Sequence, residues 1–397
     1  MARFTGEGEG RNTNATYQAA AAFRDRCLLA DGSLLFGDAP VWTEANLDRL
    51  RVKFVDAPDE SERSFREKFE DQLKDESQAV KRLASEALAV YFLFPSNVRA
   101  RKKRELIGEV LGWGGDALPE NHPVIEAFAG GIGSGGQGYN TRRPFEIAFL
   151  IRLAMAWKKL EPAKAKQLIA DAWTFEEFVD GIEDADSRQL RHMLLHLLFP
   201  EHFERIASSE HKRRVAQAFA GLLPNPEMEG ADRRLYAMRQ ELSKFLPGKS
   251  LDFYWPPLRE AWYDSAGEID VIHHKKQIVL YGPPGTGKTH EAREVAERII
   301  RSAALERWGA AKYFQEQDRV AKAVNDGVHT VQLHPAYSYE DFVRGLHFTG
   351  GKTEYRPGVL LQILGQIEAE KPEERLPHVL ILDEMWDADD LTDSPTA

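Results

Sequence analysis

The chain has little cysteine and no long apolar run, and each absence excludes a class of protein. Its 397 residues include one cysteine, Cys27, which excludes an intrachain disulfide and favours a reducing compartment. No apolar run approaches the roughly 18 residues that a membrane span requires. Residues 1–13 are glycine-rich and mixed in charge, so they lack the apolar core of a signal peptide. These absences predict a soluble, cytoplasmic protein with no membrane partner.

Positive charge is also scarce. The chain has 52 Lys and Arg against 63 Asp and Glu, a net charge of −11. This balance argues against a generally basic protein that coats nucleic acid, although it leaves room for a local basic face. The length allows two or three domains. We expect a helical N-terminal region over residues 1–110, a second helical region with a connector over 111–265, and a partial nucleotide-binding core over 266–397.

Residues 277–289 read QIVLYGPPGTGKT and fit the phosphate-binding pattern G-x-x-x-x-G-K-[ST]. An apolar strand is predicted before the loop and a helix after it, over residues 290–300. The glycines let backbone N–H groups turn towards phosphate oxygens, and the start of the helix adds its positive end. Lys288 is expected to reach the β- and γ-phosphates, and Thr289 to coordinate Mg²⁺. The predicted nucleotide-binding residues are Gly282, Pro283, Pro284, Gly285, Thr286, Gly287, Lys288 and Thr289.

Residues 377–384, PHVLILDE, form an apolar segment that ends in two carboxylates. The continuous apolar run over 379–382 predicts a strand buried on both faces of a parallel sheet. Its carboxyl end is expected to lie beside the phosphate loop, where doubly wound sheets bind ligands. Asp383 is then predicted to hold Mg²⁺, directly or through water, and Glu384 to be the base that polarises the attacking water. Taken alone, this pattern also fits an ordinary junction between a strand and a loop.

The first 250 residues have the apolar periodicity of helices. A glycine-rich stretch over 112–139 interrupts them. Its run over 130–138 has no preceding strand and no following Lys-Ser/Thr, which favours a flexible loop over a phosphate site. The predicted helices cover residues 43–52, 60–83, 84–94, 143–160, 163–173, 187–198, 210–222 and 232–245, followed by a connector over 247–262.

This helical region contains three basic clusters, over residues 99–104, 142–143 and 211–214. Such groups can neutralise DNA phosphates without reading sequence. Solvated helix faces are the alternative, because acidic runs lie elsewhere in the same region. We therefore expect any DNA contact of the helical region to involve these clusters.

A few aromatic and histidine residues have two possible roles. Tyr139, Tyr254 and Trp255 could stack on bases, but packing in a core or between domains is favoured. His192 and His196 are four residues apart and could share one helix face as metal ligands. The leucines around them favour a packed helix instead.

A distinctive stretch separates the two nucleotide motifs. A predicted buried strand over 328–334 leads into YSYEDFV at 337–343 and Gly345, and RPGVL at 356–360 opens a helix. Together with LYGPPGTGKT at 280–289, these motifs resemble the AAA+ superfamily, and in particular its McrB-type branch, the NTPase motor subunits of modified-cytosine restriction systems. The resemblance covers about 110 residues, 275–385. The helical region, with LLFPEHFER at 197–205, more loosely resembles the variable targeting halves of such proteins.

The resemblance implies a mostly α-helical N-terminal region followed by an incomplete α/β P-loop (AAA+) domain with a parallel sheet. It further implies NTP binding and hydrolysis, with Mg²⁺ and either ATP or GTP, since the loop contacts phosphates and not bases. The implied partners are DNA, bound by the helical region, a McrC-like nuclease subunit, and further copies of the chain in a ring.

The chain departs from this family after Asp383 and Glu384. Relatives continue with Asn-Arg or similar, whereas residues 385–397 are acidic and weakly apolar. The sensor strand, the arginine finger and the helical lid are not found, so we expect a truncated or frameshifted chain, or completion in trans. An arginine finger is worth roughly 10³–10⁵ in rate, so slow hydrolysis is expected of the isolated chain. The alternative function is a catalytically inactive nucleotide-binding, or DNA- or protein-targeting, fragment.

Overall fold

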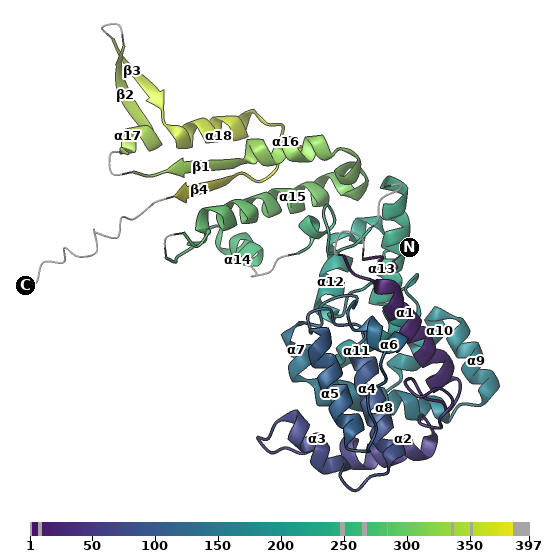
Figure 1. The fold of residues 1–397 in the computed structure, drawn as a ribbon. Coiled ribbons are helices and arrows are strands. Elements are labelled where there is room, and N and C mark those ends of the chain that lie inside the picture. Colours follow the sequence, from purple (N-terminus) through teal and green to yellow (C-terminus); the bar gives the residue numbers. More distant parts are fainter. Residues whose placement is uncertain are drawn as a thin grey trace, which may run out of the picture. The chain divides into compact units, whose positions relative to one another are not determined.

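The computed structural model describes residues 2–6, 10–246, 251–263, 268–283, 285–334, 337–349 and 352–383. The chain divides into two compact units, drawn in Figure 1. Unit 1 comprises Met1–Arg213 with Glu229–Tyr236, and unit 2 comprises Arg214–Met228 with Ala237–Ala397. In the described residues, no helix combines the length and apolarity needed to cross a bilayer.

Unit 1 is helical, as predicted. Helix α4 is buried along most of its length and packs against α2, α5 and α8, so it forms the centre of the core (Figure 1). Its helices are α1 (Thr13–Ala22), α2 (Glu44–Leu50), α3 (Phe65–Leu73), α4 (Gln78–Tyr91), α5 (Ala100–Gly112), α6 (Pro123–Ala127), α7 (Gly136–Thr141), α8 (Arg143–Lys158), α9 (Pro162–Ala170), α10 (Ala172–Asp180), α11 (Gln189–Leu198), and parts of α12 (Ser209–Ala218) and α13 (Ala231–Phe245). Two π-helical segments, η1 (Phe23–Leu28) and η2 (Arg51–Val55), extend α1 and α2, and a 3₁₀ turn, η3 (Ala185–Ser187), precedes α11.

The predicted helix over 60–83 is wrong, because two capped helices replace it. Ser64 and Glu67 form a capping box at the start of α3. Ser77 then accepts a hydrogen bond from the Val80 N–H at 3.3 Å and starts α4. Helix α4 continues to Tyr91, so the separate helix predicted over 84–94 is part of it. Helices α1, α6, α7 and α10 were not predicted as such.

The core of unit 1 is continuous across residue 110, where a domain boundary was predicted. Tyr91 of α4 stacks on Tyr139 of α7, with ring centroids 4.4 Å apart and planes 7° apart. Each hydroxyl donates to the backbone carbonyl of the other tyrosine, at 3.1 and 2.9 Å. The predicted boundary therefore does not coincide with the division of the structure. The buried Tyr139 packs in the core, as favoured above, and is not available to stack on a base.

The first part of the glycine run is packed, which corrects the prediction of a flexible loop. The Ile132 N–H donates to the Phe94 carbonyl, and the Ser96 N–H to the Gly133 carbonyl, both at 2.8 Å. Gly131 has φ +84°, and a Cβ there would lie 2.9 Å from the Ser96 Cα. Only glycine allows both this conformation and this approach.

Unit 2 contains two small sheets and five helices among its described residues, besides parts of α12 and α13 (Figure 1). Strands β1 (Val328–Gln332) and β4 (Val379–Asp383) pair in parallel, and β2 (Arg344–Thr349) and β3 (Lys352–Pro357) form an antiparallel hairpin. The helices are α14 (Glu268–Lys275), α15 (Lys288–Gln315), α16 (Gln317–Gly327), α17 (Tyr339–Phe342) and α18 (Val359–Ala369), with 3₁₀ turns η4 (Ala220–Leu222) and η5 (Arg259–Ala261). Helix α15 packs on both parallel strands and α16 packs on β1.

The strand predicted before the phosphate loop is not formed. In the described part of the chain each sheet has two strands, and residues 277–281 belong to neither. Val279 is 81% exposed and Tyr281 is 98% exposed. An extended segment becomes a strand by pairing its backbone groups with a neighbour, and here it has none.

Strands β1 and β4 lie where they were predicted, but they are not buried on both faces. Val331 and Ile381 are buried, whereas Leu382 is 37% exposed. The predicted burial on both faces is therefore wrong.

Candidate functional site

The phosphate loop turns sharply into helix α15. Gly285 and Gly287 have φ angles of +76° and +83°, a conformation that glycine adopts without strain. The helix predicted after the loop is formed, and it begins at Lys288 with Gly287 as its N-cap. The Lys288 Nζ donates to the carbonyls of Gly282 and Pro283 at 2.8 and 2.9 Å. The Thr286 hydroxyl also donates to Pro283, at 2.9 Å. The loop therefore curls over its own lysine.

The two predicted metal ligands lie in contact although they are 94 residues apart in the chain. The Thr289 hydroxyl, in the first turn of α15, donates to Asp383 Oδ2 at 3.0 Å. Asp383 ends β4 opposite Gln332, and its carbonyl accepts from the Leu333 N–H at 2.9 Å. The parallel register thus places the carboxylate beside the helix that leaves the loop.

This pair of oxygen donors fits Mg²⁺, which prefers hard oxygen ligands and usually binds one or two carboxylates together with phosphates and water. In the described residues there is no group of three or more His, Cys, Asp or Glu that could hold a metal by itself. Phosphate oxygens and water would complete the coordination of a cation held by this pair. Glu384, the predicted base, and Pro284 of the loop lie outside the described residues, as does the acidic segment 385–397.

Between β1 and α18, the distinctive stretch forms helix α17 and the β2–β3 hairpin. Ser338 and Asp341 make a capping box that starts α17. The Gly358 N–H donates to the Val343 carbonyl at 2.7 Å, just before α18 begins. A Cβ on Gly358 would lie 2.5 Å from the Phe342 carbonyl carbon, so the close packing of α18 on α17 requires glycine.

Three of the predicted phosphate contacts have structural roles instead. Lys103 is fully buried, its Nζ donates to the Pro95 carbonyl at 2.6 Å, and burial lowers its pKa to about 7. The Arg143 guanidinium lies over the rings of Tyr91 and Phe92. Lys212 is buried against Asp232. Each prediction failed because a run of basic residues does not show which members point inward.

Lys212 belongs to a buried charged cluster that the sequence did not reveal. Arg191 of α11 contacts Glu176 and Asp180 of α10 and Asp232 of α13. Lys212 of α12 also contacts Asp232. Buried charges are retained where they are paired, and this cluster ties four helices together. The only signal in the sequence is a set of charged residues on helix faces that otherwise pack inward.

His192 lies at the edge of this cluster. Its contacts exclude the possibility that it acts as a base to activate the neighbouring Ser209 as a nucleophile. Its Nδ1 lies 2.7 Å from an Arg191 nitrogen and 3.0 Å from the Lys212 Nζ, both of which are donors. Nδ1 must therefore accept, and Nε2 carries the proton and donates to the Ser209 hydroxyl at 2.9 Å. A ring in this tautomer cannot take the serine proton. Burial, reinforced by Lys212, lowers the pKa of His192 and keeps it neutral.

His196 is committed to packing, as predicted. It is fully buried, its Nε2 lies 2.8 Å from the Tyr17 hydroxyl and its Nδ1 lies 2.7 Å from the Phe203 carbonyl oxygen. Both ring nitrogens are therefore occupied, and the two histidines do not converge on a shared ligand. In unit 2, Tyr254 packs edge-to-face on Trp262, which supports packing over base stacking for this residue.

Comparison with known proteins agrees with the geometry of the site. Residues 277–392 match the AAA domain of the dynein-related subfamily. The chain is 32% identical over 111 residues to the type IV methyl-directed restriction enzyme EcoKMcrB subunit of Escherichia coli (strain K12). That similarity covers 28% of this chain and 19% of the relative. No solved structure matches. Residues 277–392 therefore match an AAA domain of the dynein-related subfamily, and the chain is similar to an McrB subunit over about a fifth of that subunit's length.

Proposed function

We propose that this chain binds an Mg²⁺–nucleoside triphosphate at residues 282–289 and acts in an NTP-driven DNA restriction complex. The contact between Thr289 and Asp383 supports the nucleotide site most directly, because it unites two oxygen donors that only a folded site brings together. The match of residues 277–392 to an AAA domain and the similarity of 111 residues to a restriction-enzyme subunit support the wider role.

Each part of the site has its own role in the proposed binding of the Mg²⁺–nucleotide. The backbone N–H groups of the loop and the first turn of α15 would bind the phosphates, since a helix N-terminus favours an anion. The Lys288 ammonium would bind β- and γ-phosphate oxygens in place of its two carbonyl partners. Thr289 and Asp383 would hold the cation, whose charge would neutralise that of the phosphates. We assign to Glu384 the role of orienting water for hydrolysis.

Removing the Thr289 hydroxyl tests the metal site. We expect Thr289→Val, which preserves the shape of the side chain, to weaken nucleotide binding about tenfold or more in Mg²⁺, equal to about 1.4 kcal/mol. In EDTA the variant and the wild type are expected to bind equally. Titration with a fluorescent nucleotide measures both. Thr289→Ser keeps the hydroxyl and serves as the matched control, and an equal loss in EDTA would refute a metal role.

The helical unit is proposed to bind DNA through the exposed face of α5. With Lys103 buried, the exposed basic side chains are Arg99, Arg101, Lys102 and Arg104, and Arg101 is 82% exposed. These groups contact phosphates without reading bases, so this surface predicts weak and salt-dependent binding.

Neutralising this face should reduce the salt dependence of DNA binding. The variant Arg101→Gln/Lys102→Gln/Arg104→Gln is expected to lower the slope of log K against log salt by about 2–3, because each lost phosphate contact releases roughly 0.9 fewer counterions. Lys164→Gln/Lys166→Gln, at two exposed side chains of α9, is a control that removes two positive charges elsewhere on the unit. A slope that does not change, or no binding at low salt, would favour a protein-binding role for this unit.

A McrC-like nuclease and further copies of the chain in a ring are the proposed partners. They follow from the similarity to a restriction-enzyme subunit. The second candidate function is an inactive fragment that binds nucleotide but targets DNA or protein. Hydrolysis that is abolished by Glu384→Gln would favour the motor, and nucleotide binding without hydrolysis would favour the fragment. Sedimentation with and without nucleotide tests ring assembly.

A further inference from the structure

Three hydrogen-bonded side chains, those of His329, His378 and Glu370, lie in a row in unit 2. The row lies at the amino end of the parallel strands β1 and β4, whereas Asp383 lies at their carboxyl end. The His329 Nε2, on β1, lies 2.9 Å from the His378 Nδ1, and the two rings stack with centroids 5.2 Å apart. The His378 Nε2 lies 2.9 Å from Glu370 Oε1. His378 immediately precedes β4, and Glu370 is the C-cap of α18. The row therefore joins β1, β4 and α18.

The row accepts one additional proton but not two. With both rings neutral, His378 donates from Nε2 to the Glu370 carboxylate, so its Nδ1 accepts from the His329 Nε2–H. One added proton on His378 reverses the bond between the rings, and His329 then accepts at Nε2 and carries its proton on Nδ1. Every hydrogen bond is kept. A second proton, on His329, would place two N–H groups face to face 2.9 Å apart.

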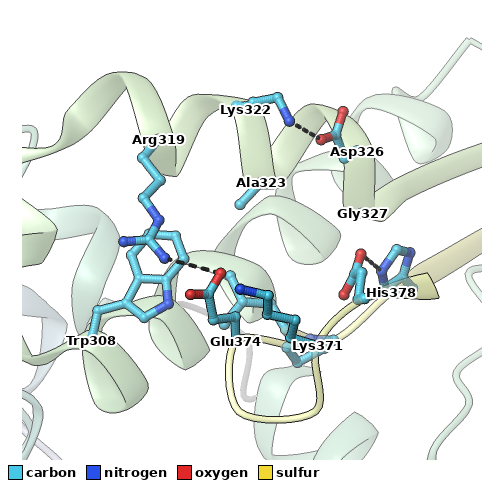
Figure 2. A pocket seen from close by; sticks show the side chains of 12 residues that line it. Trp308, Arg319, Lys322, Ala323, Asp326, Gly327, Lys371, Glu374 and His378 are labelled. Atoms are coloured by element: carbon cyan, nitrogen blue, oxygen red, sulfur yellow. Dashed lines mark hydrogen bonds and ion pairs between the residues drawn. The ribbon is translucent and has the colours of Figure 1, made fainter. Parts of the chain in front are cut away.

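The surroundings offer little to offset that second charge. His378 and Glu370 line an open pocket of about 280 Å³, shown in Figure 2, although the His378 side chain itself is only 7% exposed. The other charged groups that line the pocket are Arg319, Lys322 and Asp326 of α16, and Lys371 and Glu374 of the loop after α18.

Most of these charges already have partners. Arg319 contacts Glu316 and Glu374 and lies over the Trp308 ring, and Lys322 pairs with Asp326 (Figure 2). From α15, Arg307 donates to the carbonyls of Pro372 and Arg375. Burial, reinforced by His378, lowers the pKa of His329. Glu370 is therefore the carboxylate that balances the first proton, and nothing comparable faces His329 among the described residues.

We propose that Glu370, His378 and His329 form a proton-sensitive latch, meaning a hydrogen-bonded row that holds β1 against β4 at neutral pH. In acid the hydrogen bond between the two histidines breaks, and this end of the strand pair opens. His329 lies opposite Leu380, and the same pairing ends with Gln332 opposite Asp383. Opening the amino end of the pair loosens the strand that positions Asp383 against Thr289. Acid therefore weakens the nucleotide site without acting on it directly. The latch itself stands apart from the proposed function, and only its effect on nucleotide depends on it.

Histidine NMR on the full chain tests the latch directly. We expect the ring signals of His329 and His378 to move together in two shared steps, because protonation of one ring alters the hydrogen bond to the other. The exposed His274 serves as the reference histidine in the same spectra. Single, independent titrations of His329 and His378 that resemble that of His274 would overturn the proposal.

The variant His329→Asn tests the link to the nucleotide site. Its amide N–H can still donate to the His378 Nδ1, but it takes no proton. We expect acid to weaken nucleotide binding more in the wild type than in this variant. The ratio of the Kd at pH 5.5 to the Kd at pH 7.5 should be about tenfold larger in the wild type than in His329→Asn, which corresponds to one pK unit. His274→Asn should behave as the wild type, which controls for the loss of a histidine. Protonation of the nucleotide is common to all three proteins and cancels in the comparison. Equal ratios in His329→Asn and the wild type would overturn the link, whereas absent binding at pH 7.5 would count against the proposed function alone.

Discussion

Replacing Asp232 with alanine is expected to destabilise the helical unit by about 3–5 kcal/mol, because it leaves two buried cations without their shared partner. Asp232 is 3% exposed, and it contacts Arg191 at 3.2 Å and the buried Lys212. Burial acts to raise the pKa of Asp232, but the charges of Lys212 and Arg191 outweigh it and lower the pKa to about 2. The carboxylate is therefore charged in the folded protein.

Urea unfolding followed by circular dichroism measures this loss. Asp180→Ala is the matched control, because Asp180 contacts the same Arg191 but is 47% exposed. Exposed ion pairs contribute at most about 1 kcal/mol, so the control should lose far less stability. Similar losses in the two variants would mean that the burial of Asp232 does not govern the effect.

Lys288→Ala is expected to lower the affinity for a nucleoside triphosphate tenfold or more. The ammonium lies against the loop, at 2.8 and 2.9 Å from two of its carbonyls. Each charge-assisted contact with a phosphate oxygen is worth about 1.5–3 kcal/mol, and the variant loses them while keeping the glycine turns.

Equilibrium titration with a fluorescent nucleotide measures the effect. Lys322→Ala removes an equal charge from the same unit at a side chain that is 80% exposed and lies outside the loop, so it should bind as the wild type. Equal affinity of Lys288→Ala and the wild type would exclude residues 282–289 as the nucleotide site.

The turn of the loop and the position of Asp383 were predictable because their chemistry is local. The glycines of the loop predict a sharp turn with positive φ angles, and Gly285 and Gly287 adopt such angles. Likewise, the apolar run before Asp383 predicts a strand whose carboxyl end meets the loop, and Thr289 contacts Asp383 as expected. The role of Glu384 stays a prediction.

The basic clusters show where a prediction from sequence fails. Lys102 and Lys103 are neighbours in one run, yet Lys102 is exposed and Lys103 is fully buried. Successive helix residues differ in direction by about 100°, so the core decides which of them faces water. The pairing of Lys212 with Asp232 similarly depends on two helices that the sequence does not orient.

The sequence by itself determined the phosphate loop, its helix and the identity of the proposed metal ligands, because glycine conformation and side-chain chemistry act within a few residues. Only the tertiary structure decided that residues 277–281 lack a neighbouring strand, that Lys103 and Lys212 are buried, and that His329 meets His378. These outcomes depend on contacts between distant segments, such as the 49 residues that separate the two histidines. Burial and pairing are properties of the packed chain, and no local pattern of residues contains them.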